Sequence, residues 1–284
     1  MAGYVHPESL VSTAWLAQHL ADPDLRVVDA SYYLPMQNRS ARAEYDQRHI
    51  PGAVFFDVDE IADTSSSLPH MLPSPEKFAS RVRKLGLGDG NRIVIYDSQG
   101  LFSAARVWWE FRVFGHKDVA VLDGGLPKWI AEGRPVDDLP PQPRARHFTA
   151  RLDHSQIRDK AQMMAKLSAK RDQVVDARPA GRFHARDPEV WPGRRSGHIP
   201  GSHNLPYTEL LNPADKTLLP AEQISARFRG AGIDLARPVV ASCGSGVTAA
   251  VLALGLHLIG HRDVAVYDGS WAEWGLPGET PVES

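Results

Sequence analysis

The residues best suited to chemistry lie in one nine-residue stretch that contains the only cysteine of the chain. Residues 241–249 read Ala-Ser-Cys-Gly-Ser-Gly-Val-Thr-Ala, with Cys243 third. The apolar residues 238–240 predict a buried strand before it, and the nearly uncharged residues 247–259 predict a helix after it. Backbone N–H groups in such a turn, together with the partial positive charge of a helix N-terminus, favour a thiolate over a thiol. A buried structural cysteine is the alternative, although Gly-Ser-Gly is poor material for a core.

Three reactions suit a thiolate in an anion-binding loop: attack on a phosphoester, redox exchange and sulfur transfer. A single cysteine cannot form a Cys-x-x-Cys redox pair. Cysteine phosphatases place an arginine six residues after the cysteine to clamp the phosphate, and Ala249 occupies that position here. Sulfur transfer needs only a thiolate that accepts sulfur and a loop that stabilises a persulfide anion, so this reaction remains. The twelve histidines form no His-x3-His or Glu-x-x-His pair within a predicted helix, and we predict no metal and no cofactor.

The bulk composition describes a soluble globular protein. The 284 residues are 43% hydrophobic and 23% charged, and the net charge of -2 favours neither a nucleic acid nor a membrane surface as partner. No apolar run approaches the roughly 20 residues of a membrane span. The first residues lack the pattern of a signal peptide, and one cysteine gives no sign of an oxidising compartment. We therefore predict a cytoplasmic protein.

The chain contains an internal repeat. Three patterns occur twice in the same order, separated by 145 to 149 residues. They are Val-Val-Asp-Ala (27–30 and 174–177), His-Ile-Pro-Gly (49–52 and 198–201) and a ten-residue stretch that ends in Asp-Gly (115–124 and 260–269). Strand patterns alternate with helix patterns in each copy, which indicates parallel sheets covered by helices. We predict an α/β protein with two tandem domains, at 1–135 and 154–284, joined by a proline-rich linker at 136–153.

The repeat separates shared scaffold from residues that only one copy possesses. At the offset of 145 residues, Cys243 corresponds to Ser98, so only the second copy has the nucleophile. Asp59 and His70 are particular to the first copy, since alignment on the Leu-Pro pairs places His70 opposite Thr217. The first domain is thus expected to be catalytically silent, with polar residues of its own.

The motifs together resemble the tandem-rhodanese sulfurtransferases, most closely the 3-mercaptopyruvate sulfurtransferases. The resemblance rests on Cys-Gly-Ser-Gly-Val-Thr-Ala, the duplicated His-Ile-Pro-Gly, and Asp-Gly-Ser-Trp-Ala-Glu-Trp at 268–274, and it covers nearly the whole chain. It implies two rhodanese-like domains with the active site between them. Family members that prefer thiosulfate carry cationic residues just after the cysteine, whereas Gly-Ser-Gly is typical of those that prefer mercaptopyruvate.

The resemblance also implies roles for individual residues. Ser245, with His70 and Asp59 from the first domain, matches the proposed proton relay of the family, a base with an orienting carboxylate. Arg182 in Gly-Arg-Phe matches the arginine that binds the substrate carboxylate. The further residues expected to contact the substrate are Gly244, Gly246, Val247, Thr248 and Arg194.

One position departs from the family pattern. Trp191 stands where the mercaptopyruvate branch has a second arginine, and Arg186, Arg194 or Arg195 of the same loop could substitute for it. The expected function is transfer of sulfur from 3-mercaptopyruvate to cyanide or to a thiol acceptor such as thioredoxin, through a persulfide on Cys243. A thiosulfate:cyanide sulfurtransferase and a persulfide carrier that does not turn over small donors are the alternatives.

Overall fold

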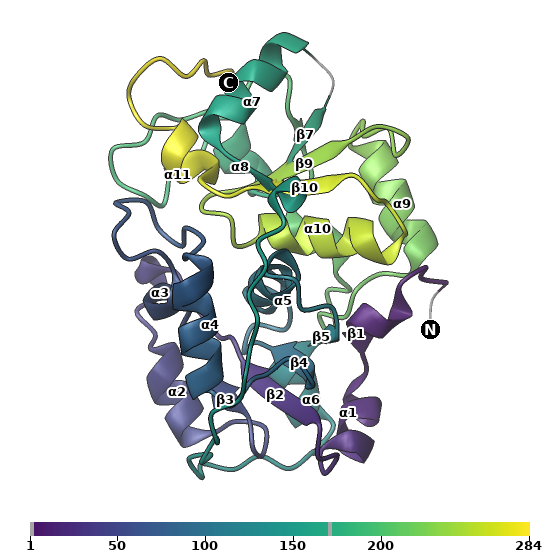
Figure 1. The fold of residues 1–284 in the computed structure, drawn as a ribbon. Coiled ribbons are helices and arrows are strands. Elements are labelled where there is room, and N and C mark those ends of the chain that lie inside the picture. The colour runs from purple at the N-terminus through teal and green to yellow at the C-terminus, as the bar shows by residue number, and fades with distance from the viewer. Residues whose placement is uncertain (1–2, 170–171) are drawn as a thin grey trace.

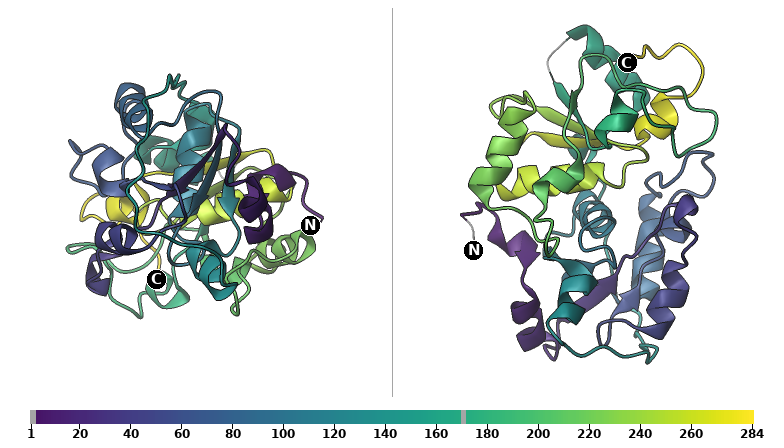
Figure 2. Two further views of the ribbon diagram at one scale, coloured as in Figure 1. Left: turned by 90° about the horizontal axis from the view of Figure 1, so that it is seen from below. Right: turned by 180° about the vertical axis from the view of Figure 1, so that it is seen from behind.

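Two α/β domains follow one another along the chain and stack end to end (Figures 1 and 2). The computed structural model describes residues 3–169 and 172–284. Each domain has a five-stranded sheet in which all neighbouring strands are parallel, in the orders β1-β5-β4-β2-β3 and β6-β10-β9-β7-β8. The identical strand order confirms the predicted fold class and the duplication.

The first domain contains five strands: β1 (Leu10–Val11), β2 (Leu25–Asp29), β3 (Val54–Phe55), β4 (Arg92–Tyr96) and β5 (Val119–Leu122). Its helices are α1 (Thr13–His19), α2 (Ala41–Gln47), α3 (Val58–Ile61), α4 (Pro75–Lys84), α5 (Ala104–Val113) and α6 (Gly125–Ala131). The strands of the second domain are β6 (Ile157–Arg158), β7 (Gln173–Asp176), β8 (His203–Asn204), β9 (Val239–Ser242) and β10 (Val264–Tyr267). Its helices are α7 (Lys160–Ala169), α8 (Ala180–Phe183), α9 (Ala221–Gly230), α10 (Ala249–Leu258) and α11 (Ser270–Trp274). Short 3-10 turns lie at η1 (Pro7–Ser9), η2 (Pro35–Gln37), η3 (His154–Gln156) and η4 (Tyr207–Leu210).

Helices α5 and α10 join the two domains. They lie between the two sheets in Figure 1 and pack against each other. Nearly all their residues are buried, which explains why neither sequence has a polar face. One apolar cluster runs through both helices and into both sheets, so the domains share a core. The carboxyl ends of β4 and β9, and the loops that follow them, are therefore held in a fixed relation.

The segment predicted to be a linker is packed along the first domain. The backbones of Asp137 and His49 exchange two hydrogen bonds, of 2.9 and 3.0 Å, and Phe148 is buried in the first-domain core. The amide of Thr149 donates to Asp89 Oδ1 at 2.8 Å. The prolines of residues 136–153 therefore mark an extended segment that packs against the first domain. Near the start of the chain, the Val5 amide donates to the carbonyl of Leu258 in α10, so this part of the chain contacts the second domain.

Two aspartates make reciprocal contacts between the domains. Asp268, after β10, accepts the Leu72 amide of the first domain at 2.8 Å. Asp123, after β5, accepts the Leu218 amide of the second domain, also at 2.8 Å. Asp268 is paired with the guanidinium of Arg106 at 2.7 Å. Asp123 contacts no guanidinium among the described residues, and burial raises its pKa to about 6, although the Leu218 amide opposes that shift.

This difference predicts opposite effects for two matched substitutions. The folded-state pKa of Asp123 lies above the ordinary 3.8. The carboxyl group therefore stabilises the fold most at low pH, and stability falls as pH rises from about 4 through 6. Asp123→Asn keeps an oxygen for the Leu218 amide and cannot ionise, so it should raise the unfolding free energy at pH 8 by about 1–3 kcal/mol and flatten this pH dependence. Urea unfolding at pH 4.5 and pH 8 measures both effects.

Asp268→Asn is the matched control. It weakens the pairing of a buried guanidinium, so we expect a loss of about 3 kcal/mol in unfolding free energy at pH 8. An Asp123→Asn protein with the same pH slope as the parent chain would contradict the unpaired state of Asp123.

Candidate active site

The sheet registers identify the first-domain counterpart of Cys243. Tyr96 ends β4 and pairs with the last residue of β2, just as Ser242 ends β9 and pairs with the last residue of β7. The next residues, Asp97 and Cys243, are therefore equivalent. The predicted counterpart, Ser98, was wrong by one residue. The offset between the two copies is one residue larger for β4 and β9 than for α5 and α10. The loop between strand and helix is therefore one residue longer in the first domain.

Asp97 shows what the loop after β4 binds. Its Oδ1 accepts the amide of Gln99 at 2.9 Å, and its Oδ2 accepts the amides of Phe102 at 2.7 Å and Ala104 at 2.9 Å. Burial raises the pKa of Asp97, and these amide bonds oppose the rise. The loop is an anion cradle that holds a carboxylate of its own chain.

In the second domain the same cradle surrounds a sulfur atom. Cys243 is only 2% exposed, and the amides of residues 244–248 donate to no acceptor within the described parts of the chain. Its own amide donates to Ser270 Oγ at 3.1 Å, and its carbonyl accepts the Trp271 amide at 2.9 Å. Helix α11 thus fixes the cysteine backbone, while the loop amides stay available for an anionic sulfur.

Three predicted relay residues come together across the domain boundary. His70 Nδ1 lies 2.9 Å from Ser245 Oγ, and His70 Nε2 lies 3.2 Å from Asp59 Oδ1. The second contact has an ion-pair distance without hydrogen-bond geometry. His70 is buried, whereas the Asp59 side chain is 67% exposed. A proton could therefore pass from the loop of the second domain to a histidine of the first.

The backbone of His70 is held in an unusual conformation. Its φ of 59° lies in the left-handed region, and its carbonyl accepts Arg106 Nη2 at 2.5 Å. Lys216 has a φ of 61° and, like His70, lies two residues before an amide that donates to the aspartate of the opposite domain. Lys216 is therefore the counterpart of His70, and the predicted Thr217 was wrong.

Arg106 is a site residue that the sequence analysis missed. It is fully buried on α5, and its Nε donates to Glu110 Oε1 at 2.8 Å. Its Nη1 donates to Asp268 Oδ1 at 2.7 Å and approaches the carbonyl of Gly246 at 3.5 Å. Burial alone would lower its pKa, but the charges of Asp268 and Glu110 outweigh burial and raise it. The available signal was an Arg–Glu pair four residues apart in a helix whose only other charged residue is Arg112.

Two side chains flank the loop just after the cysteine. A Cβ atom placed on Gly244 would lie 3.8 Å from Arg182 Nη1 and 3.9 Å from Trp191 Nε1. The Trp191 ring also contacts His70 edge-on, with 5.8 Å between the ring centroids. The Arg182 amide donates to the carbonyl of Pro179 at 3.0 Å, whereas its guanidinium donates to no acceptor among the described residues. The guanidinium interacts electrostatically with Glu189, and its N–H groups remain available for an anionic ligand. The predicted Arg182 is thus beside the loop, together with Trp191.

Arg194 is engaged elsewhere. Its Nε donates to the carbonyl of Ala272 at 2.9 Å, and its Nη1 donates to that of Pro192 at 2.8 Å. These bonds support α11 and give no sign of the predicted contact with a substrate. A further arginine that the sequence analysis missed, Arg178, is almost fully buried and interacts electrostatically with Cys243.

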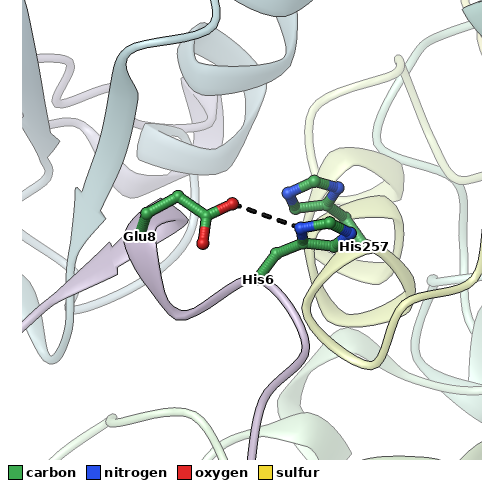
Figure 3. Close-up of side chains that lie close together, drawn as sticks. All are labelled: His6, Glu8 and His257. Carbon is green, nitrogen blue, oxygen red and sulfur yellow. Dashed lines mark hydrogen bonds and ion pairs between the residues drawn. The ribbon is translucent and has the colours of Figure 1, made fainter.

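One group of possible metal ligands lies away from the cysteine. His6, Glu8 and His257 meet where the start of the chain crosses α10 (Figure 3). The two imidazole rings stack with 4.4 Å between centroids and 10° between planes, and Glu8 Oε1 lies 3.2 Å from His6 Nδ1. Stacked rings direct their lone pairs along parallel planes and not toward one ion. The cluster as it stands is a packing contact.

Comparison with known proteins agrees with this geometry. The rhodanese-like domain family matches residues 12–132 and 159–276. The chain is 46% identical to human 3-mercaptopyruvate sulfurtransferase over 94% of this chain and 91% of that protein. It is 44% identical to the mitochondrial thiosulfate/3-mercaptopyruvate sulfurtransferase 1 of Arabidopsis thaliana, over 98% and 78%. The crystal structure of the Escherichia coli 3-mercaptopyruvate sulfotransferase SseA superposes with a TM-score of 0.85 at 39% identity, over 93% and 99%. This chain therefore belongs to the rhodanese family, among its two-domain sulfurtransferases.

Proposed function

We propose that this sulfurtransferase takes sulfur from 3-mercaptopyruvate onto Cys243 and passes it to a thiol. The observation that carries the proposal is the cradle of free amides around Cys243, whose first-domain copy holds the carboxylate of Asp97. The bonds that bind a carboxylate there suit a thiolate, and then a persulfide anion, here. Covalent catalysis divides the transfer into two steps.

In the first step the donor carboxylate binds Arg182, with the indole N–H of Trp191 beside it. The donor thiol gives its proton to the Ser245–His70 pair, and the Cys243 thiolate attacks the donor sulfur. The carbon–sulfur bond breaks, and its electron pair leaves as the enolate of pyruvate. The enolate takes the proton back, so pyruvate departs and a persulfide anion remains on the cysteine.

In the second step an acceptor thiolate attacks the outer sulfur and releases the Cys243 thiolate. Because the cysteine is only 2% exposed and the neighbouring Gly244 is partly exposed, we expect the acceptor to reach the sulfur with a narrow nucleophile past Gly244. Cyanide, a small thiol, or the projecting thiol of a protein such as thioredoxin fits this requirement. The acceptor carries the sulfur away as a thiocyanate or a new persulfide.

Charge favours a donor with one carboxylate. The loop side chains at 244–248 are all uncharged, and Arg182 is the unpaired cation beside them. Thiosulfate is a dianion and would gain more from a loop with cations of its own. A cytoplasmic location stays a prediction from the sequence. None of the described helices is long and apolar enough to cross a membrane, and one relative is named as mitochondrial.

The covalent scheme predicts a persulfide that forms without an acceptor. After incubation with 3-mercaptopyruvate, mass spectrometry should find one extra sulfur atom on Cys243 and an equal amount of pyruvate. Initial rates with varied donor and acceptor should give parallel double-reciprocal lines, and Cys243→Ser should abolish turnover. A higher kcat/KM with thiosulfate would instead establish the thiosulfate enzyme. A persulfide that only a partner protein can load would establish the carrier.

Removing the free guanidinium should weaken donor binding. A hydrogen bond to a charged group contributes about 1.5–3 kcal/mol, so Arg182→Met should lower kcat/KM for 3-mercaptopyruvate by about 10- to 100-fold, chiefly through KM. Arg229→Met is the matched control, because Arg229 is exposed on α9 of the same domain, and it should change kcat/KM by less than about 2-fold. Equal losses in both variants would contradict a specific role for Arg182.

A further inference from the structure

The first domain has a cavity of about 800 Å³ beside the loop that contains Ser98. Residues of β2, α2 and α6 line it, and none of the lining residues belongs to the second domain. The relay and the cysteine loop do not contribute to it. Among the residues that line the cavity are Asp29, Ser31, Glu44, Arg48 and Leu126.

The second domain fills the equivalent place with the side chain of Arg178. Its guanidinium donates to Asp176 through Nε and Nη2, at 2.8 to 3.2 Å, and to Glu189 through Nη1 at 2.8 Å. Nη2 also donates to the carbonyl of Gly197 at 2.8 Å, and the group lies 4.4 Å from the ring centre of Trp271. Two carboxylates, a carbonyl and a flat apolar face thus surround one guanidinium.

Ser31 stands where the second domain has Arg178. Asp29 and Asp176 each end the second strand of their domain, and each carboxylate accepts the amide two residues later, at 2.8 and 2.9 Å. Those two amides belong to Ser31 and Arg178. The short serine side chain leaves the carboxylate of Asp29 without the guanidinium that its counterpart has.

The remaining partners of Arg178 also have counterparts on the cavity wall. Arg48 precedes His49 as Gly197 precedes its histidine in the second His-Ile-Pro-Gly, so the Arg48 carbonyl corresponds to that of Gly197. Leu126 is equivalent to Trp271, because each donates its amide to the carbonyl of the residue after the central strand. Glu44 is a second carboxylate on the wall, and it is already paired with Arg39, which also lines the cavity.

Of the two carboxylates on the cavity wall, Glu44 has a cationic partner and Asp29 has none among the described residues. Glu44 is paired with Arg39 through bonds of 2.7 and 2.6 Å, and the Arg48 side chain is exposed. Asp29 is almost fully buried and contacts no cation among the described residues. Burial raises its pKa to about 6, although hydrogen bonds from Ser31 and Tyr96 oppose the rise. A cation that reached Asp29 would relieve this cost.

We propose that this cavity of the first domain is a binding site for a compound bearing a guanidinium group, held by Asp29 as Asp176 holds Arg178. The planar fork of a guanidinium matches the two oxygens of a carboxylate, and its flat face packs on apolar groups such as Leu126. An ammonium ion lacks both properties. The site is separate from the sulfur-transfer chemistry and does not depend on the donor or acceptor proposed above.

The test uses methylguanidinium as the probe on the full chain. Titration followed by backbone amide NMR should give saturable shifts at Ser31 and Ser98. Methylammonium at equal concentration should bind at least 10-fold more weakly. Asp29→Asn should weaken methylguanidinium binding at least 10-fold. Ser31→Arg, which supplies the guanidinium from the chain itself, should abolish the shifts and raise the melting temperature.

Ser80→Arg is the matched control, because it adds the same charge at an exposed position on α4. It should leave the titration and the melting temperature unchanged. Sulfurtransferase activity should be the same in all these variants, which separates this test from that of the proposed function. Linear shifts without saturation, equal shifts with methylammonium, or shifts that persist in Asp29→Asn or Ser31→Arg would each overturn the proposal. If Ser31→Arg does not fold, Asp29→Asn alone decides.

Discussion

A single buried guanidinium holds the active site together. Arg106 lies at the centre of the interface, where a charge without partners would cost several kcal/mol. Asp268 and Glu110 compensate it, and its remaining donor binds the carbonyl of His70. Gly246 adapts to the same group, because its φ is 79° and a Cβ atom there would lie 2.8 Å from Arg106 Nη1. The interface, the histidine backbone and the cysteine loop therefore form one mutually dependent unit.

The two domains show how few residues separate a loop that holds a carboxylate from a loop that holds a cysteine. Both have the same strand order and an amide cradle at the same place. Asp97 satisfies its cradle with a carboxylate, which stabilises the loop and leaves no nucleophile. Cys243 leaves the amides free, which sacrifices hydrogen bonds in the resting protein and allows a sulfur anion to form there. Each loop is covered by a residue of the other domain, Lys216 over the first and His70 over the second.

Local patterns predicted what depends on local physics. The strand predicted at 238–240 and the helix predicted at 247–259 appear as β9 and α10, and the cysteine loop between them was found from its own residues. The sequence could not reveal sheet register, so the counterpart of Cys243 was placed one residue away. The prolines of residues 136–153 suggested a linker. The residues that this segment contacts, such as His49 and Asp89, are distant in sequence, so a local pattern could not reveal the packing. Arg106 was missed because a buried charge becomes visible only when its partners are known.

In the proposed mechanism, the side chains beside Gly244 explain how the single cation of Arg182 can suffice to bind the donor carboxylate. The Trp191 ring contacts His70 edge-on, and both Trp191 and the guanidinium of Arg182 lie beside Gly244. A large apolar ring excludes water, and an ion pair strengthens as the local dielectric constant falls. An arginine in place of Trp191 would add a second positive charge, but it would also keep water near the donor carboxylate. With the donor bound as proposed, Trp191 would strengthen the single ion pair with Arg182, and its edge contact would shield His70 from bulk solvent. In the proposed mechanism, a tryptophan at position 191 affects how the donor carboxylate is held and not the reaction at Cys243.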